Sequence, residues 1–288
     1  MSSQGDAYVV SDKERQRREF RRARQRRSTM VATGSTIVVA VALWFGITHA
    51  PGWHDARATF FSGGSFRHDA PDIAKGLLID LEILAIASPC VVVLALIIAT
   101  MRTSVSPVLA PFRIGGALYV DLFRGCPMIL LLILFGVGIP SLRLHGVTNS
   151  AEVWGTAAIV LSYSGFVTED FRAGILSVHP SQRAAARSLG LNSAQTLRLV
   201  VLPQAIRNVV PVLLNEFVSL QRDVGLVGIV GAAVDAVQQA TIDNESTFNF
   251  TPYVIAALLF MVLAIPSGRL ADRYTIRAFQ RQQAGGAV

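Results

Sequence analysis

The sequence predicts an all-α protein that crosses a membrane several times. Of its 288 residues, 52% are hydrophobic and 16% are charged, whereas soluble domains carry about 25% charged residues. Long uncharged runs separate the charged stretches. Hydrocarbon offers no partner for backbone N–H and C=O groups, so these runs are expected to be helices. The short alternating segments typical of a β-barrel are absent.

A basic segment opens the chain. Residues 1–27 carry eight arginines between positions 15 and 27 and are interpreted as a cytoplasmic tail that is disordered or lies on a surface. The region 28–49 has no charge from Ser28 to Thr48. This is enough to span about 30 Å of hydrocarbon at about 1.5 Å per residue. We expect a retained transmembrane helix here; a cleaved signal peptide is the alternative.

Five further apolar segments each predict one crossing, which gives six transmembrane helices. They are Ile83–Met101, Tyr119–Leu142, Val153–Thr168, Asn208–Val234 and Ser246–Gly268. The formal net charge of +7 comes mostly from arginines, which gather in alternate connections on the side of the basic tail. This pattern fits loops beside anionic lipid rather than nucleic-acid binding, and it predicts that both termini are cytoplasmic.

Residues 72–273 are expected to form the transmembrane domain, and 274–288 a C-terminal tail. Within this domain, the connection 171–205 is too long to be unstructured. A short helix near Gln182–Leu189 is expected to end at Gly190, and Asn192 with Gln195 predicts a capping box for a second helix that stops at Pro203. The pattern alone leaves two roles open: docking on a partner protein, or lying on the membrane surface.

Several motifs in this region resemble those of known transporters. The stretch AAARSLGL at 184–191, followed by LPQA at 202–205, is similar to the Glu-Ala-Ala loop of bacterial ABC importer permeases. Other stretches resemble the polar amino acid subfamily of histidine, glutamine and glutamate type. These are FRGCP at 123–127, EDFRAGI at 169–175, the segment 211–223, and FTPY at 250–253.

The resemblance implies a five-helix type I ABC importer core preceded by one extra N-terminal helix. It also implies that the loop 171–205 docks on an ATP-binding subunit. The docking residues would be Gln182, Ala184, Ala185, Ala186, Gly190, Leu191, Leu202 and Pro203. The sequence departs from the family pattern at Ala184, where the family has a glutamate that supports the loop or its docking.

Charged residues inside a crossing are costly and therefore suggest function. The candidates for a translocation path or gate are Asn215, Glu216, Arg222, Asp223 and Glu169. Arg222 and Asp223 are adjacent and must point apart on a helix. The alternative is that these charges only lock helices together. Glu169 is expected to pair with Arg172, and Arg124 is interpreted as reaching toward the headgroups.

No catalytic residue is assigned. Lysine occurs only at Lys13 and Lys75, so the chain has no Gly-x-x-x-x-Gly-Lys motif for ATP phosphates. ATP and Mg²⁺ would therefore be bound by a partner subunit, and this chain would bind no cofactor. The five histidines and two cysteines are scattered, and no metal site is predicted.

These features predict the permease subunit of an ABC importer that moves a polar amino acid into the cytoplasm by alternating access. Such a chain would be a multi-pass protein of the bacterial plasma (inner) membrane. The resemblance implies as partners two ATP-binding subunits, a second permease of the same or related sequence, and an extracytoplasmic solute-binding protein. An ion-coupled secondary transporter and a membrane scaffold protein remain as alternatives.

Overall fold

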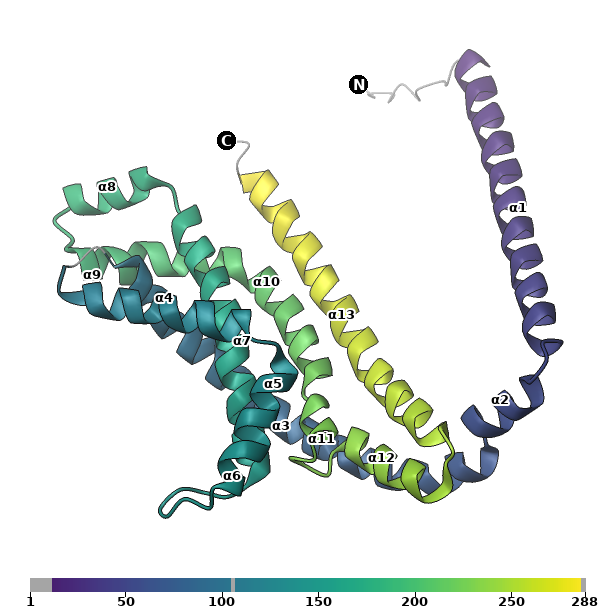
Figure 1. Ribbon diagram of the computed structural model, residues 1–288. Coiled ribbons are helices and arrows are strands. Elements are labelled where there is room, and N and C mark those ends of the chain that lie inside the picture. Colours follow the sequence, from purple (N-terminus) through teal and green to yellow (C-terminus); the bar gives the residue numbers. More distant parts are fainter. Residues whose placement is uncertain (1–11, 105–106, 286–288) are drawn as a thin grey trace, which may run out of the picture. The chain divides into compact units, whose positions relative to one another are not determined.

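The chain is almost entirely helical in the computed structural model, which describes residues 12–104 and 107–285 (Figure 1). Within these two ranges no strand occurs, in agreement with the predicted all-α class. The chain divides by its internal packing into two units, Met1–Ala58 and Thr59–Val288.

The first unit consists of one long helix, α1 (Asp12–Thr48), and most of a short one, α2 (Trp53–Phe60). The part Arg27–Thr48 is apolar enough to cross a membrane, and none of it is buried. An apolar helix exposed in this way needs lipid or another protein around it. From residue 12 onward the basic segment forms part of the same helix rather than a disordered tail; residues 1–11 lie outside the described ranges.

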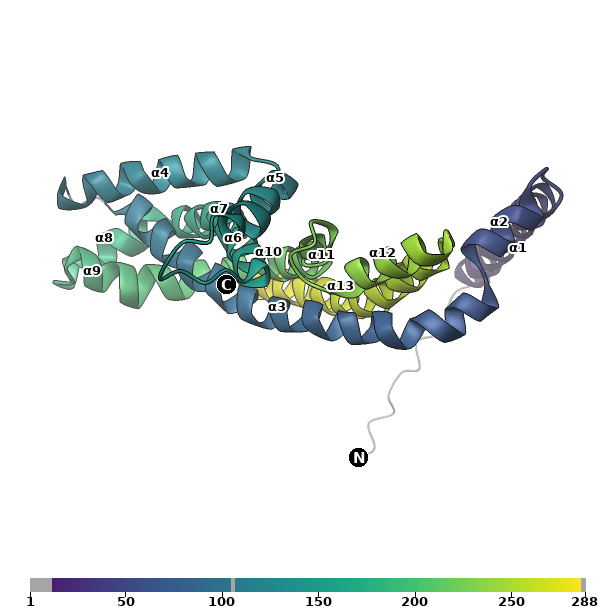
Figure 2. The ribbon, with the colours of Figure 1, turned by 60° about the horizontal axis from the view of Figure 1, so that its bottom comes forward.

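The second unit is built along α3 (Gly63–Thr103), which contacts five other helices of the described ranges. These are α4 (Ala110–Gly125), α7 (Ala151–Ser177), α10 (Leu202–Asp223), α12 (Ala236–Thr247) and α13 (Thr251–Gly285). Figure 2 shows α12 and α13 beside one half of α3, while α7 crosses its other half. α3 therefore connects two parts of the unit that carry different polar groups.

Small side chains allow the helices of this unit to approach closely. Ala87 and Ala95 on α3 and Ala158 on α7 are fully buried. A Cβ atom at Gly174 on α7 would overlap the side chain of Val209 on α10. Close packing of this kind is typical of membrane helices, whose association depends on van der Waals contact rather than on the hydrophobic effect.

The segment 119–142, predicted as one continuous crossing, is broken. α4 (Ala110–Gly125) ends before Pro127. A second helical stretch follows, made of α5 (Met128–Leu132), the π-helix η2 (Ile133–Gly138) and α6 (Ile139–Ser141), and it is bent by 104° from the first. The prediction was wrong because proline disfavours helical backbone in the residue before it, and Cys126 is extended (φ −91°, ψ 129°).

The connection 171–205 begins later than predicted, because α7 runs to Ser177. The helix α8 (Pro180–Ser188) corresponds to the first short helix expected there. Gly190 follows with φ +85°, the left-handed backbone that glycine adopts after a helix. The predicted capping box is confirmed: Asn192 Oδ1 accepts from the Gln195 N–H and Gln195 Oε1 accepts from the Asn192 N–H, both at 2.9 Å.

The second helix of this connection does not stop at Pro203, and that prediction was wrong. α9 (Ser193–Thr196), the π-helix η3 (Leu197–Val201) and α10 follow one another without interruption. Pro203 lies in the first turn of α10, directly after the wider π-helical turn. The shifted hydrogen-bond register there accommodates a residue that has no N–H. One continuous helix thus connects the loop to the charged positions 216–223.

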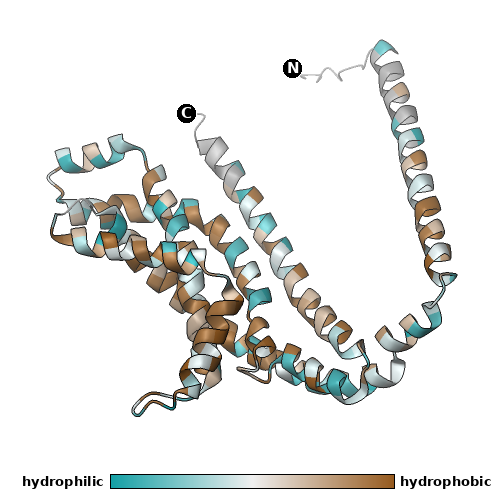
Figure 3. Cartoon of the chain, viewed as in Figure 1, coloured by the Kyte–Doolittle hydropathy of each residue, from teal (hydrophilic) through white to brown (hydrophobic). Residues whose placement is uncertain are grey.

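Four helices of the described ranges are long and apolar enough to cross a membrane, and the bent pair makes a fifth (Figure 3). The 27-residue helix α7 contains the segment 153–168 but is not among these candidates, so a crossing there stays a prediction. The count of six and the side on which the termini lie stay predictions. Two predicted boundaries shift. α10 ends at Asp223 and is followed by the short helix α11 (Leu226–Ile229), after which Gly231 has left-handed backbone. α13 begins at Thr251, after the left-handed Phe248 that ends α12.

The buried side chain of Asp235 organises the start of α12. Its Oδ1 accepts hydrogen bonds from the N–H groups of Val237 and Gln238, both at 2.9 Å, and its Oδ2 accepts one from Gly228 at 2.6 Å. Burial raises the pKa of Asp235 to about 6, so the carboxylate is ionised at neutral pH. A charged acceptor with three N–H donors ties the turn after α10 to the start of α12.

Asp80, on α3, connects α3 to the start of α12. It is 1% exposed, and its Oδ2 accepts a hydrogen bond from the Ala236 N–H at 3.2 Å. Its Oδ1 has no partner among the described residues. One turn earlier, a Cβ atom at Gly76 would lie 2.6 Å from the carbonyl carbon of Asp235. At Gly76 the backbones of α3 and of the start of α12 are therefore in direct contact, with no room for a larger residue.

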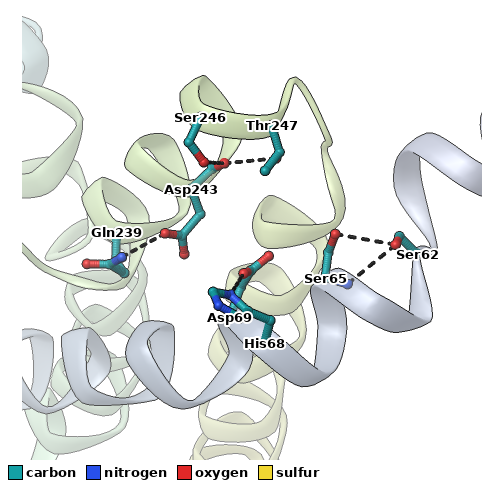
Figure 4. Close-up of polar contacts among 8 residues, drawn as sticks. All are labelled: Ser62, Ser65, His68, Asp69, Gln239, Asp243, Ser246 and Thr247. Carbon is teal, nitrogen blue, oxygen red and sulfur yellow. Dashed lines mark hydrogen bonds and ion pairs between the residues drawn. The ribbon is translucent and has the colours of Figure 1, made fainter.

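A second set of polar contacts lies near the start of α3 (Figure 4). His68 Nδ1 and Asp69 Oδ1 are 2.7 Å apart, and Gln239 Nε2 donates to Asp243 Oδ1 at 2.9 Å. Figure 4 shows Asp243 on α12 facing the His68–Asp69 pair on α3. Burial raises the pKa of Asp243. Charged groups thus mark the end of the unit that lies away from α8 in Figures 1 and 2.

Asparagine substitutions should separate the roles of the two buried aspartates. Asp80→Asn removes a buried negative charge and keeps an acceptor for Ala236, so we expect an unchanged or higher unfolding temperature. Asp235→Asn leaves one amide oxygen for three N–H donors and should lower the free energy of unfolding by about 1–3 kcal/mol. Thermal unfolding of the full chain in detergent measures both. A larger loss for Asp80→Asn than for Asp235→Asn would contradict this account.

Candidate functional site

A cavity of about 510 Å³ opens between α4, α5, α7 and α10. It lies at the break in the bent helix pair, so the break exposes side chains that a continuous helix would direct elsewhere. The lining residues are Arg124, Gly125, Cys126, Pro127, Met128, Ser162, Tyr163, Phe166, Glu216 and Asp223. Three of the ten carry charge, which distinguishes this cavity from an apolar packing defect.

Arg124 supplies the positive charge of the cavity. Its guanidinium carbon lies 5.4 Å from the ring centroid of Phe166 on α7, within the distance of a cation–π interaction. A Cβ atom at Gly165 would come within 3.3 Å of the Arg124 side chain, so the glycine leaves room for it. No described carboxylate forms an ion pair with Arg124. Instead of reaching only toward headgroups, Arg124 is available to an anion in the cavity.

Glu216 and Asp223 supply the negative charges. They are seven residues apart on α10, which places them on one face two helical turns apart. Asp223 Oδ2 accepts a hydrogen bond from the Tyr163 O–H at 2.7 Å. Tyr163 is 6% exposed, so this bond holds the carboxylate in one orientation. Glu216 has no hydrogen bond or ion pair with any described residue.

The other two candidates on α10 do not line the cavity. Asn215 and Arg222 are exposed on the surface of this chain. Arg222 Nη2 donates to Ser219 Oγ at 3.3 Å. Arg222 and Asp223 therefore point apart, as predicted for adjacent helical residues. Exposed polar groups on a membrane helix need a protein partner or water.

Glu169 lies one and a half turns beyond Tyr163 on α7, in a separate network outside the cavity. Its Oε2 accepts from Arg172 Nε at 2.7 Å, which confirms the predicted pair. Its Oε1 also pairs with Arg102 at the end of α3. The side chains of Glu169 and Arg102 are 19% and 15% exposed. This triad fixes the ends of α3 and α7 to each other; it places Glu169 away from the cavity wall.

The docking candidates form an exposed surface on α8 and its connection. Gln182, Ala184 and Ala185 are exposed, while Ala186 is buried against the unit. The Leu189 side chain is 83% exposed. The remaining candidates differ: Gly190 and Pro203 are exposed, whereas Leu191 and Leu202 are half-buried. A surface of small residues with one protruding leucine can be approached closely by another protein.

Side-chain bonds hold α8 in place. Arg183 Nη2 donates to the Ile175 carbonyl at 2.6 Å, which connects α8 to the end of α7. Arg187 Nη2 donates to Ser193 Oγ at 3.0 Å, which connects α8 to α9. These two hydrogen bonds therefore connect α8 to α7 on one side and to α9 on the other.

Sequence reasoning missed the uncharged part of the cavity wall. Ser162, Tyr163 and Phe166 gave no signal, because aromatic and hydroxyl residues are common in any crossing. Two signals were available: the seven-residue spacing of Glu216 and Asp223, and the proline that follows Arg124 in the FRGCP stretch.

Comparison with known proteins identifies relatives of the chain. A family described as "Binding-protein-dependent transport system inner membrane component" matches residues 92–278. A "Probable glutamine ABC transporter permease protein" of Bacillus subtilis (strain 168) is 37% identical over 177 residues, covering 60% of this chain and 78% of the relative. An arginine transport system permease protein of the same organism is 28% identical over 197 residues, covering 68% and 87%.

The chain also resembles a solved structure, that of an amino acid ABC transporter with histidines. The match covers 72% of this chain and 94% of the transporter chain, with a TM-score of 0.62 and 32% sequence identity. The fold is therefore shared over 72% of this chain.

Replacing Glu169 tests the ion triad. Glu169→Gln removes the charge that neutralises Arg102 and Arg172, and we expect the free energy of unfolding to fall by about 1–3 kcal/mol. Thermal unfolding in detergent measures the change. Glu152→Gln, the same substitution at the other end of α7 where no ion pair is formed, is the control. Equal effects of the two substitutions would show that the triad adds no stability.

Proposed function

Since the chain belongs to the family of inner-membrane components of binding-protein-dependent transport systems, we propose that it is the permease subunit of an ATP-driven importer that carries a polar amino acid into the cytoplasm. The observation that carries this proposal is the charged cavity. The guanidinium of Arg124 and the carboxylate of Asp223 on its walls are complementary to the carboxylate and ammonium groups of a zwitterion.

The cavity walls offer a distinct partner to each end of an amino acid. Arg124 would receive the α-carboxylate, since guanidinium and carboxylate form paired hydrogen bonds. Asp223, oriented by Tyr163, would receive the α-ammonium. Within a low-dielectric protein such charge pairs are far stronger than in water, so a neutral solute would bind less well.

The surface of α8 would dock on an ATP-binding subunit, which would hold ATP and Mg²⁺. The exposed residues Gln182, Ala184 and Ala185 would form the contact, with Leu189 protruding from it. Ala184 replaces the glutamate of the family motif, so the contact at this position would rest on packing instead of charge. Two ATP-binding subunits would serve two permeases of the same or related sequence.

Docking and cargo binding would be coupled through one helix. The run from Ser193 to Asp223 is continuous and about 45 Å long at about 1.5 Å per residue. A packed helix moves as a rigid body. Movement of α8 and α9 by the ATP-binding subunit would therefore shift Glu216 and Asp223, and this would open the cavity to alternate sides.

The arrangement in the membrane follows from this role. The α8 side would be cytoplasmic, and the α12 side would receive cargo from an extracytoplasmic solute-binding protein. Six crossings, with residues 28–49 as the extra helix and 72–273 as the permease domain, would leave both tails, 1–27 and 274–288, in the cytoplasm. Arginine placement supports this orientation.

A change at Gly190 should uncouple the two subunits. Gly190 has φ +85°, where a side chain costs about 1–2 kcal/mol, so Gly190→Asp should deform the α8–α9 connection. We expect amino-acid uptake in proteoliposomes to fall roughly tenfold or more, while ATP hydrolysis and membrane insertion persist.

Gly146→Asp is the matched control. Gly146 has φ +80° and equally open surroundings, but it lies in the loop before α7, away from α8. Its strain should leave uptake close to normal. Normal uptake by the Gly190→Asp variant would count against docking through α8.

A further inference from the structure

The charges around the cavity do not balance. Its walls hold Arg124 against Glu216 and Asp223. Asp170, one turn beyond Phe166 on α7, lies close enough to interact electrostatically with both Arg124 and Glu216. Its Oδ2 is buried without a partner in the described structure. Arg222 interacts electrostatically with Tyr163 but is exposed and does not line the cavity. On the cavity wall itself two carboxylates face one guanidinium, and Asp170 adds a third carboxylate behind them, so negative charge is in excess.

The two carboxylates on α10 are too far apart to share one cation. Seven residues correspond to about 10 Å along a helix. An ammonium group placed against Asp223 therefore leaves Glu216 without a counter-ion. Glu216 has no hydrogen bond or ion pair with any described residue, and a partly buried charge without a partner is costly.

From this imbalance we propose that the cargo carries a second positive charge on its side chain, as lysine and arginine do. This inference rests on the proposed function. Arg124 takes the α-carboxylate, Asp223 takes the α-ammonium, and Glu216 takes the side-chain ammonium or guanidinium. Asp170 adds negative potential behind Glu216. An acidic side chain would instead bring a third negative group toward Glu216 and is excluded by repulsion.

The size of the site agrees with such a cargo. Lysine and arginine are unbranched, and they carry their two cationic groups at opposite ends of an extended side chain. A cavity of about 510 Å³ that holds two carboxylates two helical turns apart can meet both groups at once. Glutamine fills a similar shape but leaves Glu216 unneutralised.

Cys126 provides a reporter for occupancy. It lines the cavity, and its thiol is free and partly accessible. In a Cys90→Ser background, N-ethylmaleimide labels this cysteine alone. The experiment measures how L-arginine, L-lysine, L-glutamine and L-glutamate slow that labelling in the full chain, purified with its ATP-binding subunits.

Arginine and lysine should give half-protection at concentrations at least tenfold below glutamine, with glutamate weakest. If glutamine or glutamate protects Cys126 as well as arginine does, the proposal of a cationic cargo is wrong, while the proposal of an amino-acid permease still stands. Labelling that no amino acid slows, or a Cys126 that never reacts, would overturn the cavity as a cargo site and with it the proposed function.

The Glu216→Gln variant tests whether Glu216 binds the cationic group on the cargo side chain. Protection by arginine should then require at least tenfold more ligand, while protection by glutamine is kept or improved. Glu82→Gln on α3, an exposed position that does not line the cavity, should leave the ranking unchanged. An equal loss for all four amino acids in Glu216→Gln would show that this residue only supports the cavity wall. If the variant fails to fold, the ranking in the Cys90→Ser protein decides the question.

Discussion

A charged side chain in a membrane-crossing helix must be paired inside the protein or face water, and this requirement governs the arrangement of the second unit. Glu169 meets it with Arg102 and Arg172. Asp223 meets it with the Tyr163 hydroxyl, and Arg124 lies against Phe166. Where pairing is least complete, around Arg124 and Glu216, the chain leaves a cavity. Unpaired charge and open space therefore coincide, which is the condition for binding a charged solute.

The helix α7 brings these features together. Its residues 162–166 form one wall of the cavity, and its next turns carry Asp170 and the ion triad. Glycines allow this: Gly165 leaves room for Arg124, and Gly174 lets α10 approach. A change of packing along α7 would reach both the cavity and the end of α3, so in the proposed function it would link cargo binding to the position of the α8 side.

The unbroken helical run from α9 through α10 connects the proposed docking surface directly to the cavity. A stop at Pro203 would have placed a flexible joint between them, whereas the π-helical turn keeps the path helical. The curated relatives are named for different cargoes, glutamine in one case and arginine in another. Membership of the family therefore does not determine the charge of the cargo, which has to be inferred from the residues that line the cavity.

Local rules were enough for the apolar helices, the capping box at Asn192, the glycine end at Gly190 and the Glu169–Arg172 pair. Each of these depends on residues within about four positions of one another or on the composition of a single segment. The contacts of Glu169 with Arg102 and of Asp223 with Tyr163 join residues 67 and 60 positions apart. The sequence places these groups in separate crossings. Only the packing of α3, α7 and α10 brings Glu169 to Arg102 and Asp223 to Tyr163, because the energy of close helix packing depends on surfaces that no single segment contains. Of these four residues, Tyr163 and Asp223 line the cavity, which lies beside the break at Cys126 and Pro127.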